Sequence, residues 1–351
     1  MHVYLLVYLL AAGSAFLVRS PRRSWHLAIL TGVFLALFIG TRHEVGCDFT
    51  AYAARYESLY PATVGWLQGL QMGEGGFHII NILSRDLGWG FRGVVMLCAI
   101  LYAWGLVRFS RLAPRPMAFV AIAIPILVVQ LGMSGMRQAT ATALLMLAYV
   151  AFTQRRQWLT AGWIGLAFLF HESAIAFLPM ALLARRQISA KYLVVGVILL
   201  APLAGMLLGE RLDVYSARYV DQIYGENSAG GAWIRYAIAA TPLFLCWWKR
   251  GKVQAAFPTL YPLLWIFMLI TMALVLVGGV SSVALHRLTF YVLPVSLLAL
   301  LCVVECAFAP TSRRLAWGIP FAMYGLYIVS WFTMSRHGTS CYIPYQSWLL
   351  Q

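Results

Sequence analysis

The sequence predicts an all-α protein, a polytopic transmembrane helical bundle of about twelve spans. Hydrophobic residues make up 62% of the 351 residues and charged residues 11%, whereas an ordinary soluble domain has about 25% charged residues. The mean hydropathy is +0.79. The apolar residues form long unbroken runs, whereas the strands of a transmembrane β-barrel are short and alternate with polar residues. Much of the apolar surface is therefore expected to face lipid.

The apolar runs define the expected spans in order. They cover residues 3–18, 25–41, 91–107, 117–134, 137–153, 158–171, 173–184, 191–208, 232–248, 257–278, 287–307 and 315–334. No basic segment precedes the run at residues 1–18, so we interpret it as a span and not as a signal peptide. Residues 1–351 then form a single integral membrane domain. Its two long loops are 42–90, with a short interfacial helix at 77–87, and 209–231.

The charges differ sharply between the two sides of this topology. Six short connections carry sixteen basic residues and no acidic residue. The opposite side carries ten arginines, no lysine and ten of the eleven acidic residues. By the positive-inside rule the first side faces the cytoplasm, and both termini and both long loops face the outside. The formal charge of +15 therefore reflects orientation in a membrane, and we expect no nucleic-acid partner.

The connections on the cytoplasmic side are too short to fold as a nucleotide-binding domain. The phosphate-binding patterns GxxxxGK[ST] and GxGxxG do not occur in the sequence. No internal repeat is evident, although transporter folds often contain one. The function is therefore expected on the extracytoplasmic side.

Arginines on that side begin or end three expected spans. Arg42 closes the second span, Arg137 opens the fifth and Arg287 opens the eleventh. Free backbone N–H groups at a helix N-terminus favour an anion, and the planar guanidinium can grip phosphate through two hydrogen bonds. The three arginines are therefore candidates for binding a diphosphate. The alternative is that each one anchors its helix at the membrane interface.

The hairpin that ends at Arg185 is too short for two full passes. Between Gln157 and Arg185 lie 27 residues, so each arm climbs about 20 Å at 1.5 Å per residue, less than a hydrocarbon core of about 30 Å. Its tip, His171-Glu172-Ser173, is expected about 10 Å below the outer boundary. Ionisable groups at that depth are costly and usually face a water-filled cavity.

His171 is a candidate general base, because a neutral imidazole can take a proton at pH 7. The alternative is a structural hydrogen bond between helices. Glu172 can orient His171 or pair with an arginine. Asp48 is a second candidate acid, or it can form an ion pair with Arg42 that closes the loop. Tyr52 can stack on a sugar ring.

We expect no metal and no cofactor, because the sequence has no Asp-x-Asp, HExxH or Cys/His cluster. His43, Glu44 and Asp48 are the one candidate group for a cation. Cys47 and Cys341 are the cysteines that fall outside the membrane on the oxidising side, so a disulfide between them is allowed.

Five segments of the chain together resemble a known family. They are Arg42 with Gly46-Cys47-Asp48 and Tyr52; Glu74-Gly75-Gly76-Phe77; Met136-Arg137-Gln138-Ala139; Phe170-His171-Glu172-Ser173-Ala174; and Arg287 with Tyr291. In order and spacing, over about residues 25–300, they are similar to the EpsG-like, Wzy-type polysaccharide polymerases. The chain departs from that pattern at Cys47 and Phe49, where the family prefers Thr and Tyr, and at Gly75, where proline is usual.

The resemblance implies a GT-C-like, membrane-embedded glycosyltransferase. Such an enzyme joins undecaprenyl-diphosphate-linked oligosaccharide repeat units into an exopolysaccharide, capsule or O-antigen chain outside the bacterial inner membrane. It implies Tyr52 and Glu74 as sugar-binding residues, a metal-independent inverting transfer, and a flippase and a chain-length regulator as partners. A glycan ligase and a lipid-linked oligosaccharide flippase are the alternatives. The flippase is disfavoured because the inner side offers almost exclusively arginines and lysines in loops.

Overall fold

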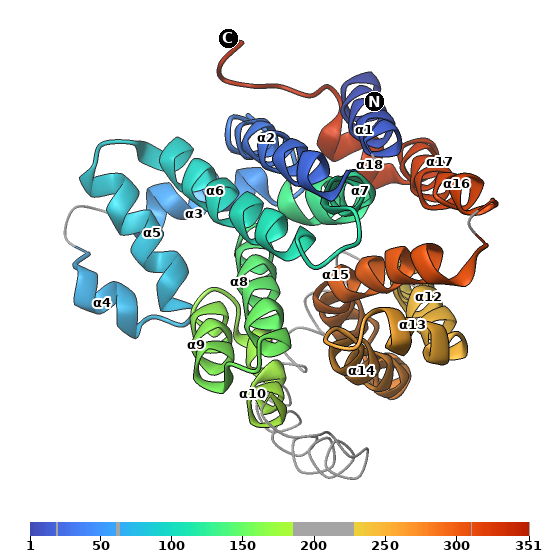
Figure 1. The fold of residues 1–351 in the computed structure, drawn as a ribbon. Coiled ribbons are helices and arrows are strands. Elements are labelled where there is room, and N and C mark those ends of the chain that lie inside the picture. The colour runs from blue at the N-terminus through green and yellow to red at the C-terminus, as the bar shows by residue number, and fades with distance from the viewer. Residues whose placement is uncertain (19, 61–63, 185–227, 310, 351) are drawn as a thin grey trace.

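The computed structural model describes residues 1–18, 20–60, 64–184, 228–309 and 311–350, and this part of the chain folds into helices joined by short connections (Figure 1). No β-strand occurs within these ranges. One isolated β-bridge joins Arg42 to Ser347. The prediction of an all-α fold is confirmed.

The helices follow the order of the expected spans. They are α1 (His2–Leu17), α2 (Pro21–Gly40), α3 (Phe49–Leu59), α4 (Trp66–Gln71), α5 (Gly75–Asp86), α6 (Gly90–Ser110), α7 (Pro116–Ala123), η1 (Ile124–Gly132), α8 (Met136–Thr153), α9 (Gln157–Phe168), η2 (Glu172–Phe177), α10 (Pro179–Leu183), α12 (Ser228–Trp248), α13 (Arg250–Ala256), α14 (Tyr261–Val280), α15 (Ser282–Ala307), α16 (Arg313–Ala316), α17 (Gly318–Met334) and α18 (Arg336–Tyr342). Of these, η1 is a π-helix and η2 is a 3-10 helix.

Several of these helices have the length and apolarity that a membrane crossing requires. In the described part of the chain five segments do so, namely Pro21–Gly40, Gly90–Ser110, Tyr261–Gly279, Ser282–Ala307 and Arg313–Met334. The chain is therefore a membrane protein. Helices lie on every expected span within the described residues, and the span expected at 191–208 lies outside them. The total of about twelve crossings stays a prediction.

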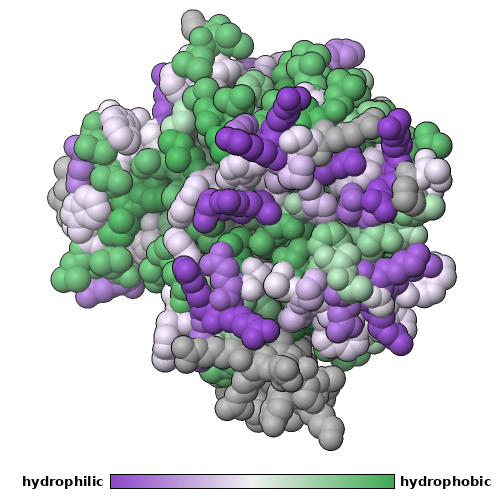
Figure 2. Space-filling model, in the orientation of Figure 1, coloured by the Kyte–Doolittle hydropathy of each residue, from purple (hydrophilic) through white to green (hydrophobic). Residues whose placement is uncertain are grey.

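The helices divide into a buried centre and an apolar periphery. All residues of α7 are buried, as are most residues of α8 and α15. In contrast, α1 exposes Leu6, Leu9, Leu10 and Leu17, which are 58–78% accessible. On the face drawn in Figure 2, apolar patches are wide at the upper left, and hydrophilic side chains lie across the middle and the right of the view. Exposed leucines on peripheral helices are expected where helices face lipid.

Close packing against α6 helps to fix α8, the helix that begins at the candidate site. A Cβ atom on Gly105 would lie 2.5 Å from the backbone oxygen of Ala143, so glycine is required where the two helices meet. Small residues allow this kind of close backbone approach between membrane helices.

The hairpin tip differs from the single span that was expected at 173–184. The structure has the 3-10 helix η2 followed by the short α10. Pro179 begins α10, and proline cannot donate the backbone hydrogen bond that would continue a helix through it. His171 consequently lies in the connection between α9 and η2, outside both helices.

The first long loop is more helical than expected. Within 42–90 the chain forms α3, α4 and α5, and α5 lies on the interfacial helix expected at 77–87. Of the second loop, 209–231, residues 209–227 lie outside the described residues.

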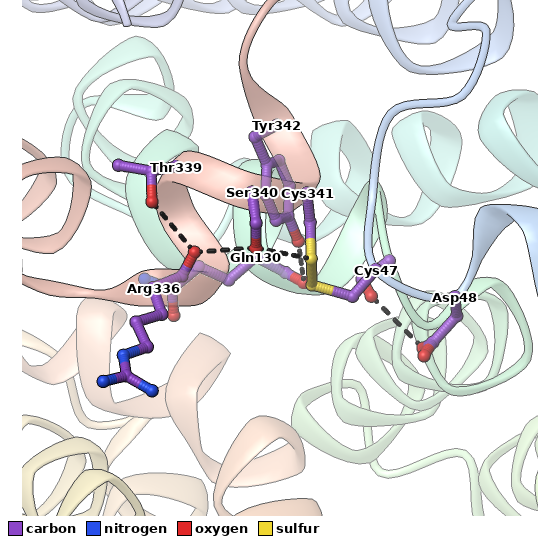
Figure 3. Close-up of a disulfide and its surroundings, with 9 residues drawn as sticks. Cys47, Asp48, Gln130, Arg336, Thr339, Ser340, Cys341 and Tyr342 are labelled. Carbon is purple, nitrogen blue, oxygen red and sulfur yellow. Dashed lines mark hydrogen bonds between the residues drawn. A yellow bond between two sulfur atoms is a disulfide. The ribbon is translucent and has the colours of Figure 1, made fainter. Parts of the chain in front are cut away.

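The C-terminal segment ties down the start of the first loop. Cys47 and Cys341, 294 residues apart, form a disulfide (Figure 3). Beside it the amide of Gly46 donates to the carbonyl of Cys341 at 2.8 Å, and the amide of Trp348 donates to that of Thr41 at 3.0 Å. The sequence allowed a disulfide between Cys47 and Cys341, and the structure contains it.

Candidate functional site

Arg137 lies in the first turn of α8 and connects two segments that are distant in sequence. Its Nη1 forms an ion pair with Glu74, which precedes α5. Its Nε donates to the hydroxyl of Tyr52 in α3 at 3.3 Å, and the guanidinium carbon lies 5.7 Å from the centre of that ring. The side chain of Arg137 is 33% exposed, so it is only partly buried although these contacts hold it in place.

Glu74 adopts an unusual backbone conformation at this position. Its φ of 62° lies in the left-handed region, which is uncommon for a residue other than glycine. Such a conformation costs on the order of 1 kcal/mol and is found preferentially at functional sites. The turn directs the Glu74 carboxylate toward both Arg137 and His171.

His171 continues the polar network on the other side of Glu74. Its Nδ1 lies 3.5 Å from Oε1 of Glu74 and 3.2 Å from the hydroxyl of Ser173. The Ser173 hydroxyl in turn lies 2.9 Å from the hydroxyl of Tyr291 in α15. A continuous path of polar contacts thus runs from Tyr52 through Arg137, Glu74, His171 and Ser173 to Tyr291. We call these six residues the polar network.

The surroundings of His171 favour its neutral form. Burial lowers the pKa of the imidazole, and the positive charges of Arg287 and Arg137 lower it further. The nearby carboxylate of Glu74 pairs with Arg137. A lowered pKa means that the imidazole is unprotonated at neutral pH, the form that can accept a proton.

Helix α5 is docked against the hairpin tip, which brings Glu74 to His171. The amide of Gly76 donates to the carbonyl of Leu169 at 2.9 Å. Glu172 lies close to the same turn, because a Cβ atom on Gly73 would be 3.2 Å from its Oε1. Glu172 therefore lies at the edge of the network, and Glu74 occupies the position beside the imidazole that we expected for Glu172 or Asp48.

Arg42 has a different environment from Arg137. Its side chain is 2% exposed, and its Nη1 and Nε donate to the carbonyls of Ile39 at 2.6 Å and Val45 at 3.1 Å. Asp48 accepts a hydrogen bond from Ser134 at 3.2 Å. The contacts of Arg42 are with backbone carbonyls, and the contact of Asp48 is with Ser134. The ion pair proposed between Asp48 and Arg42 is not among these contacts, and none of them joins Arg42 to the polar network.

Glycine explains how the loop of Asp48 reaches the start of α8. Gly46 has a φ of +102°, and a Cβ atom there would lie 1.8 Å from the backbone oxygen of Met133. The loop therefore packs directly against the connection between η1 and α8. Asp48 consequently contacts Ser134, three residues before Arg137.

Arg287 lies on α15 near the same network. The side-chain amide of Gln138 donates to the backbone carbonyl of Arg287 at 2.7 Å, which places the first turn of α8 against α15. Its positive charge lowers the pKa of the His171 imidazole. Arg137 and Arg287 are therefore positioned on two helices around the same imidazole.

Two residues of the network were missed by reasoning from the sequence. Ser173 and Tyr291 belong to the segments that carry the family resemblance, but no role was assigned to either. The sequence could have revealed them, because each is a polar side chain within an apolar run. The gathering of Gln130, Arg235, His286 and Tyr327 into a further polar cluster was not predicted either, and it is described below.

The described residues contain no group of three or more His, Cys, Asp or Glu side chains arranged to hold a metal ion. The candidates His43, Glu44 and Asp48 are thus not gathered as a set of ligands. The polar network supplies guanidinium, carboxylate, imidazole and hydroxyl groups. This donor set suits an anion and a proton transfer better than a divalent cation.

The fold and the network together define a polytopic membrane protein with a basic, partly buried polar site. The sequence model of the EpsG family matches residues 25–347, so the chain belongs to the EpsG family. Membership indicates a polymerase-like function in polysaccharide biosynthesis. No characterised protein and no solved structure matches the chain.

Proposed function

We propose that the protein is a glycosyltransferase that joins undecaprenyl-diphosphate-linked oligosaccharide repeat units into a polysaccharide chain. The observation that carries this proposal is the contact path from Arg137 through Glu74 to His171. It places a cation suited to diphosphate next to a neutral imidazole suited to accept a proton. The transfer of a glycan from a diphosphate carrier to a hydroxyl group needs both.

Arg137 and Arg287 bind the diphosphate of the donor in this proposal. The Glu74 carboxylate and a phosphate oxygen are both anions, so phosphate can replace or share the carboxylate's hydrogen bonds to Arg137. As the bond to the sugar breaks, negative charge grows on the diphosphate, and the two guanidiniums stabilise it. This accounts for a transfer that needs no metal.

His171 is the proposed general base. An N–H on Nδ1 directed at Glu74 leaves the lone pair of Nε2 to accept the proton of the acceptor hydroxyl. The hydroxyl oxygen bonds to the anomeric carbon, the bond from that carbon to the diphosphate breaks, and the diphosphate leaves with the electron pair. A single displacement of this kind inverts the anomeric configuration. Glu74 then acts as the supporting acid, with Tyr52 beside the sugar.

The disulfide supports placing this site outside the cytoplasm. Disulfides persist in oxidising compartments, and Cys47 is the neighbour of Asp48, which contacts the start of α8 through Ser134. We propose that the network opens toward the periplasm or outside of a bacterial inner membrane, in a GT-C-like arrangement of about twelve spans. A flippase would deliver the units and a chain-length regulator would limit the product.

The test uses the purified full chain in liposomes with undecaprenyl-diphosphate-linked repeat units from a strain that lacks the polymerase. Product length is read on a gel. We expect long chains from the wild type and about tenfold less product from Arg137→Lys, which keeps the charge and loses the planar fork. The matched control is Arg92→Lys, an exposed arginine at the start of α6, which should polymerise normally.

Two outcomes would overturn the proposal. Normal product from Arg137→Lys would contradict the role of that guanidinium. Transfer of one unit to an acceptor that is not lipid-linked, without chain growth, would identify a ligase. Repeating the reaction in excess EDTA tests the metal-independent mechanism, since activity that is lost and then restored by Mg²⁺ or Mn²⁺ would contradict it.

A further inference from the structure

A second polar cluster lies next to the polar network and centres on Arg235 of α12. Its Nη2 donates to the side-chain oxygen of Gln130 at 3.1 Å, and its Nη1 contacts the imidazole of His286, 3.1 Å from Nε2. The guanidinium carbon lies 4.7 Å from the centre of the Phe290 ring. Gln130 also donates to the hydroxyl of Tyr327 at 2.9 Å. Groups from η1 and α15 thus contact one guanidinium of α12, and Tyr327 of α17 holds Gln130 in turn.

The position of Gln130 depends on the π-helix η1. Pro125 near its start cannot donate a backbone hydrogen bond, and a π-helix places one additional residue in each turn. Such segments are frequent at functional sites because they redirect side chains. The backbone carbonyl of Gln130 accepts a hydrogen bond from Tyr342, the residue after the disulfide-bonded Cys341 (Figure 3). Gln130 is 7% exposed, and tertiary contacts to both its backbone and its side chain hold it in place.

The two clusters share α15 and the junction of η1 with α8. His286 contacts Arg235, and the next residue, Arg287, accepts a hydrogen bond from Gln138 at its backbone carbonyl. Gln138 in turn follows Arg137. Arg137, Arg287 and Arg235 therefore lie in succession on α8, α15 and α12, with Arg287 between the other two.

We propose that Arg235 is a ligand in a second diphosphate subsite, next to the donor subsite, and that Gln130 and Tyr327 position its guanidinium. This inference rests on the proposed function. A transfer between two lipid-linked units brings two lipid diphosphates to one site, one on the donor and one on the acceptor. The donor diphosphate binds at Arg137 and Arg287, and the acceptor diphosphate binds at Arg235. The fixed guanidinium plane suits a phosphate bound through two hydrogen bonds.

The first experiment counts bound lipid by native mass spectrometry of the purified full chain with undecaprenyl diphosphate. We expect two molecules per chain at saturation, one in Arg235→Gln, one in Arg137→Gln and none in the double variant. Loss of one molecule in Arg235→Gln alone, with Arg137→Gln unchanged, would reject the donor subsite and keep this one. Two molecules in Arg235→Gln, or one in the wild type, would overturn the second subsite. Equal binding of phosphatidylglycerol in place of the second molecule would also overturn it.

The second experiment separates a binding role from a structural tie. In Gln130→Glu the new carboxylate pairs with Arg235. If the contact between these two residues serves only to hold the helices together, this change keeps or strengthens it. A diphosphate subsite would instead be blocked by the carboxylate. We expect an unchanged or higher Tm together with at least about tenfold weaker binding of the second undecaprenyl diphosphate, by loss of an arginine–phosphate contact. The control is Gln254→Glu on the exposed face of α13. Unchanged binding in Gln130→Glu would contradict the proposal.

Discussion

Arg42 and Arg137 both lie at the end of a helix, yet the structure places them in different kinds of surroundings. Arg42 is buried and donates hydrogen bonds to two backbone carbonyls, beside a loop that a disulfide ties to the C-terminal segment. Arg137 is one-third exposed and pairs with the carboxylate of Glu74 and the hydroxyl of Tyr52. Backbone carbonyls that lose a buried donor have no substitute partner, whereas a carboxylate can yield its place to a phosphate. The surroundings of Arg42 therefore fix that side chain in place, whereas Arg137 can exchange its carboxylate partner for a phosphate.

The largest effect should come from His171, because the region around Arg137 carries the proposed chemistry. His171→Ala removes the imidazole, and we expect polymer to fall by about 10²–10⁴-fold, the usual contribution of a general base. Expression and single lipid-linked units should be unaffected. The measurement is product formed in liposomes from a fixed amount of protein.

His171→Gln then separates a base from a positioning residue. Glutamine can form hydrogen bonds but cannot take the proton. Polymer near the wild-type amount from His171→Gln would remove the base assignment, and Asp48→Asn would be the next variant to measure. A loss as large as in His171→Ala supports proton transfer.

Glu74 should show the next largest effect. Glu74→Gln keeps the size of the side chain but removes the charge that pairs with Arg137 and faces His171. We expect about tenfold to a hundredfold less polymer, a smaller loss than the roughly 10²–10⁴-fold expected for the general base itself. Initial rates of polymerisation measure the change. Activity equal to wild type would leave Glu74 as a structural partner of Arg137, and the strained backbone would then need another explanation.

Arg42 should affect stability more than chemistry. Arg42→Met leaves the carbonyls of Ile39 and Val45 without their buried donor, at about 1–3 kcal/mol for each unsatisfied group. A lower Tm in detergent is expected, with the exposed Arg92→Met as control. A variant that keeps its Tm but no longer polymerises would instead assign Arg42 to the diphosphate, as the sequence predicted.

The disulfide should contribute a similar stabilisation to the same region. Cys47→Ser is expected to cost about 2–4 kcal/mol, and to lower the Tm in detergent. The control is Cys246→Ser, because Cys246 is a buried free cysteine. Thiol labelling of denatured protein without reductant should modify four cysteines in the wild type, since Cys98, Cys246, Cys302 and Cys306 are free. Labelling of all six cysteines would contradict the disulfide.

The smallest effect concerns pH. Burial, Arg287 and Arg137 lower the pKa of His171, so its base form persists as the pH falls below the ordinary histidine value of about 6.5. Activity that depends on this base should be retained from pH 8 to about pH 6.5 and decline only at lower pH. Arg287→Gln removes a positive charge and should shift the acid limb to higher pH. An acid limb that does not move in Arg287→Gln would assign it to another group.

The sequence by itself determined the helices and the segments that meet at the site. Long apolar runs predict helices because a chain in lipid must satisfy its backbone hydrogen bonds internally. Arg137 was predicted from its place at a helix start, and His171 from the short hairpin. The match of residues 25–347 to the EpsG family agrees with the resemblance carried by the same segments.

Only the tertiary structure decided what each polar side chain contacts. Where a helix is apolar on nearly every face, the sequence pattern does not tell which way it is rotated about its axis, and packing against several neighbours decides this. The pairing of Glu74 with His171, the burial of Arg42 on carbonyls and the disulfide across 294 residues all depend on such packing. The cluster at Arg235 depends on it most, because the π-helix that redirects Gln130 has no simple signature in the sequence.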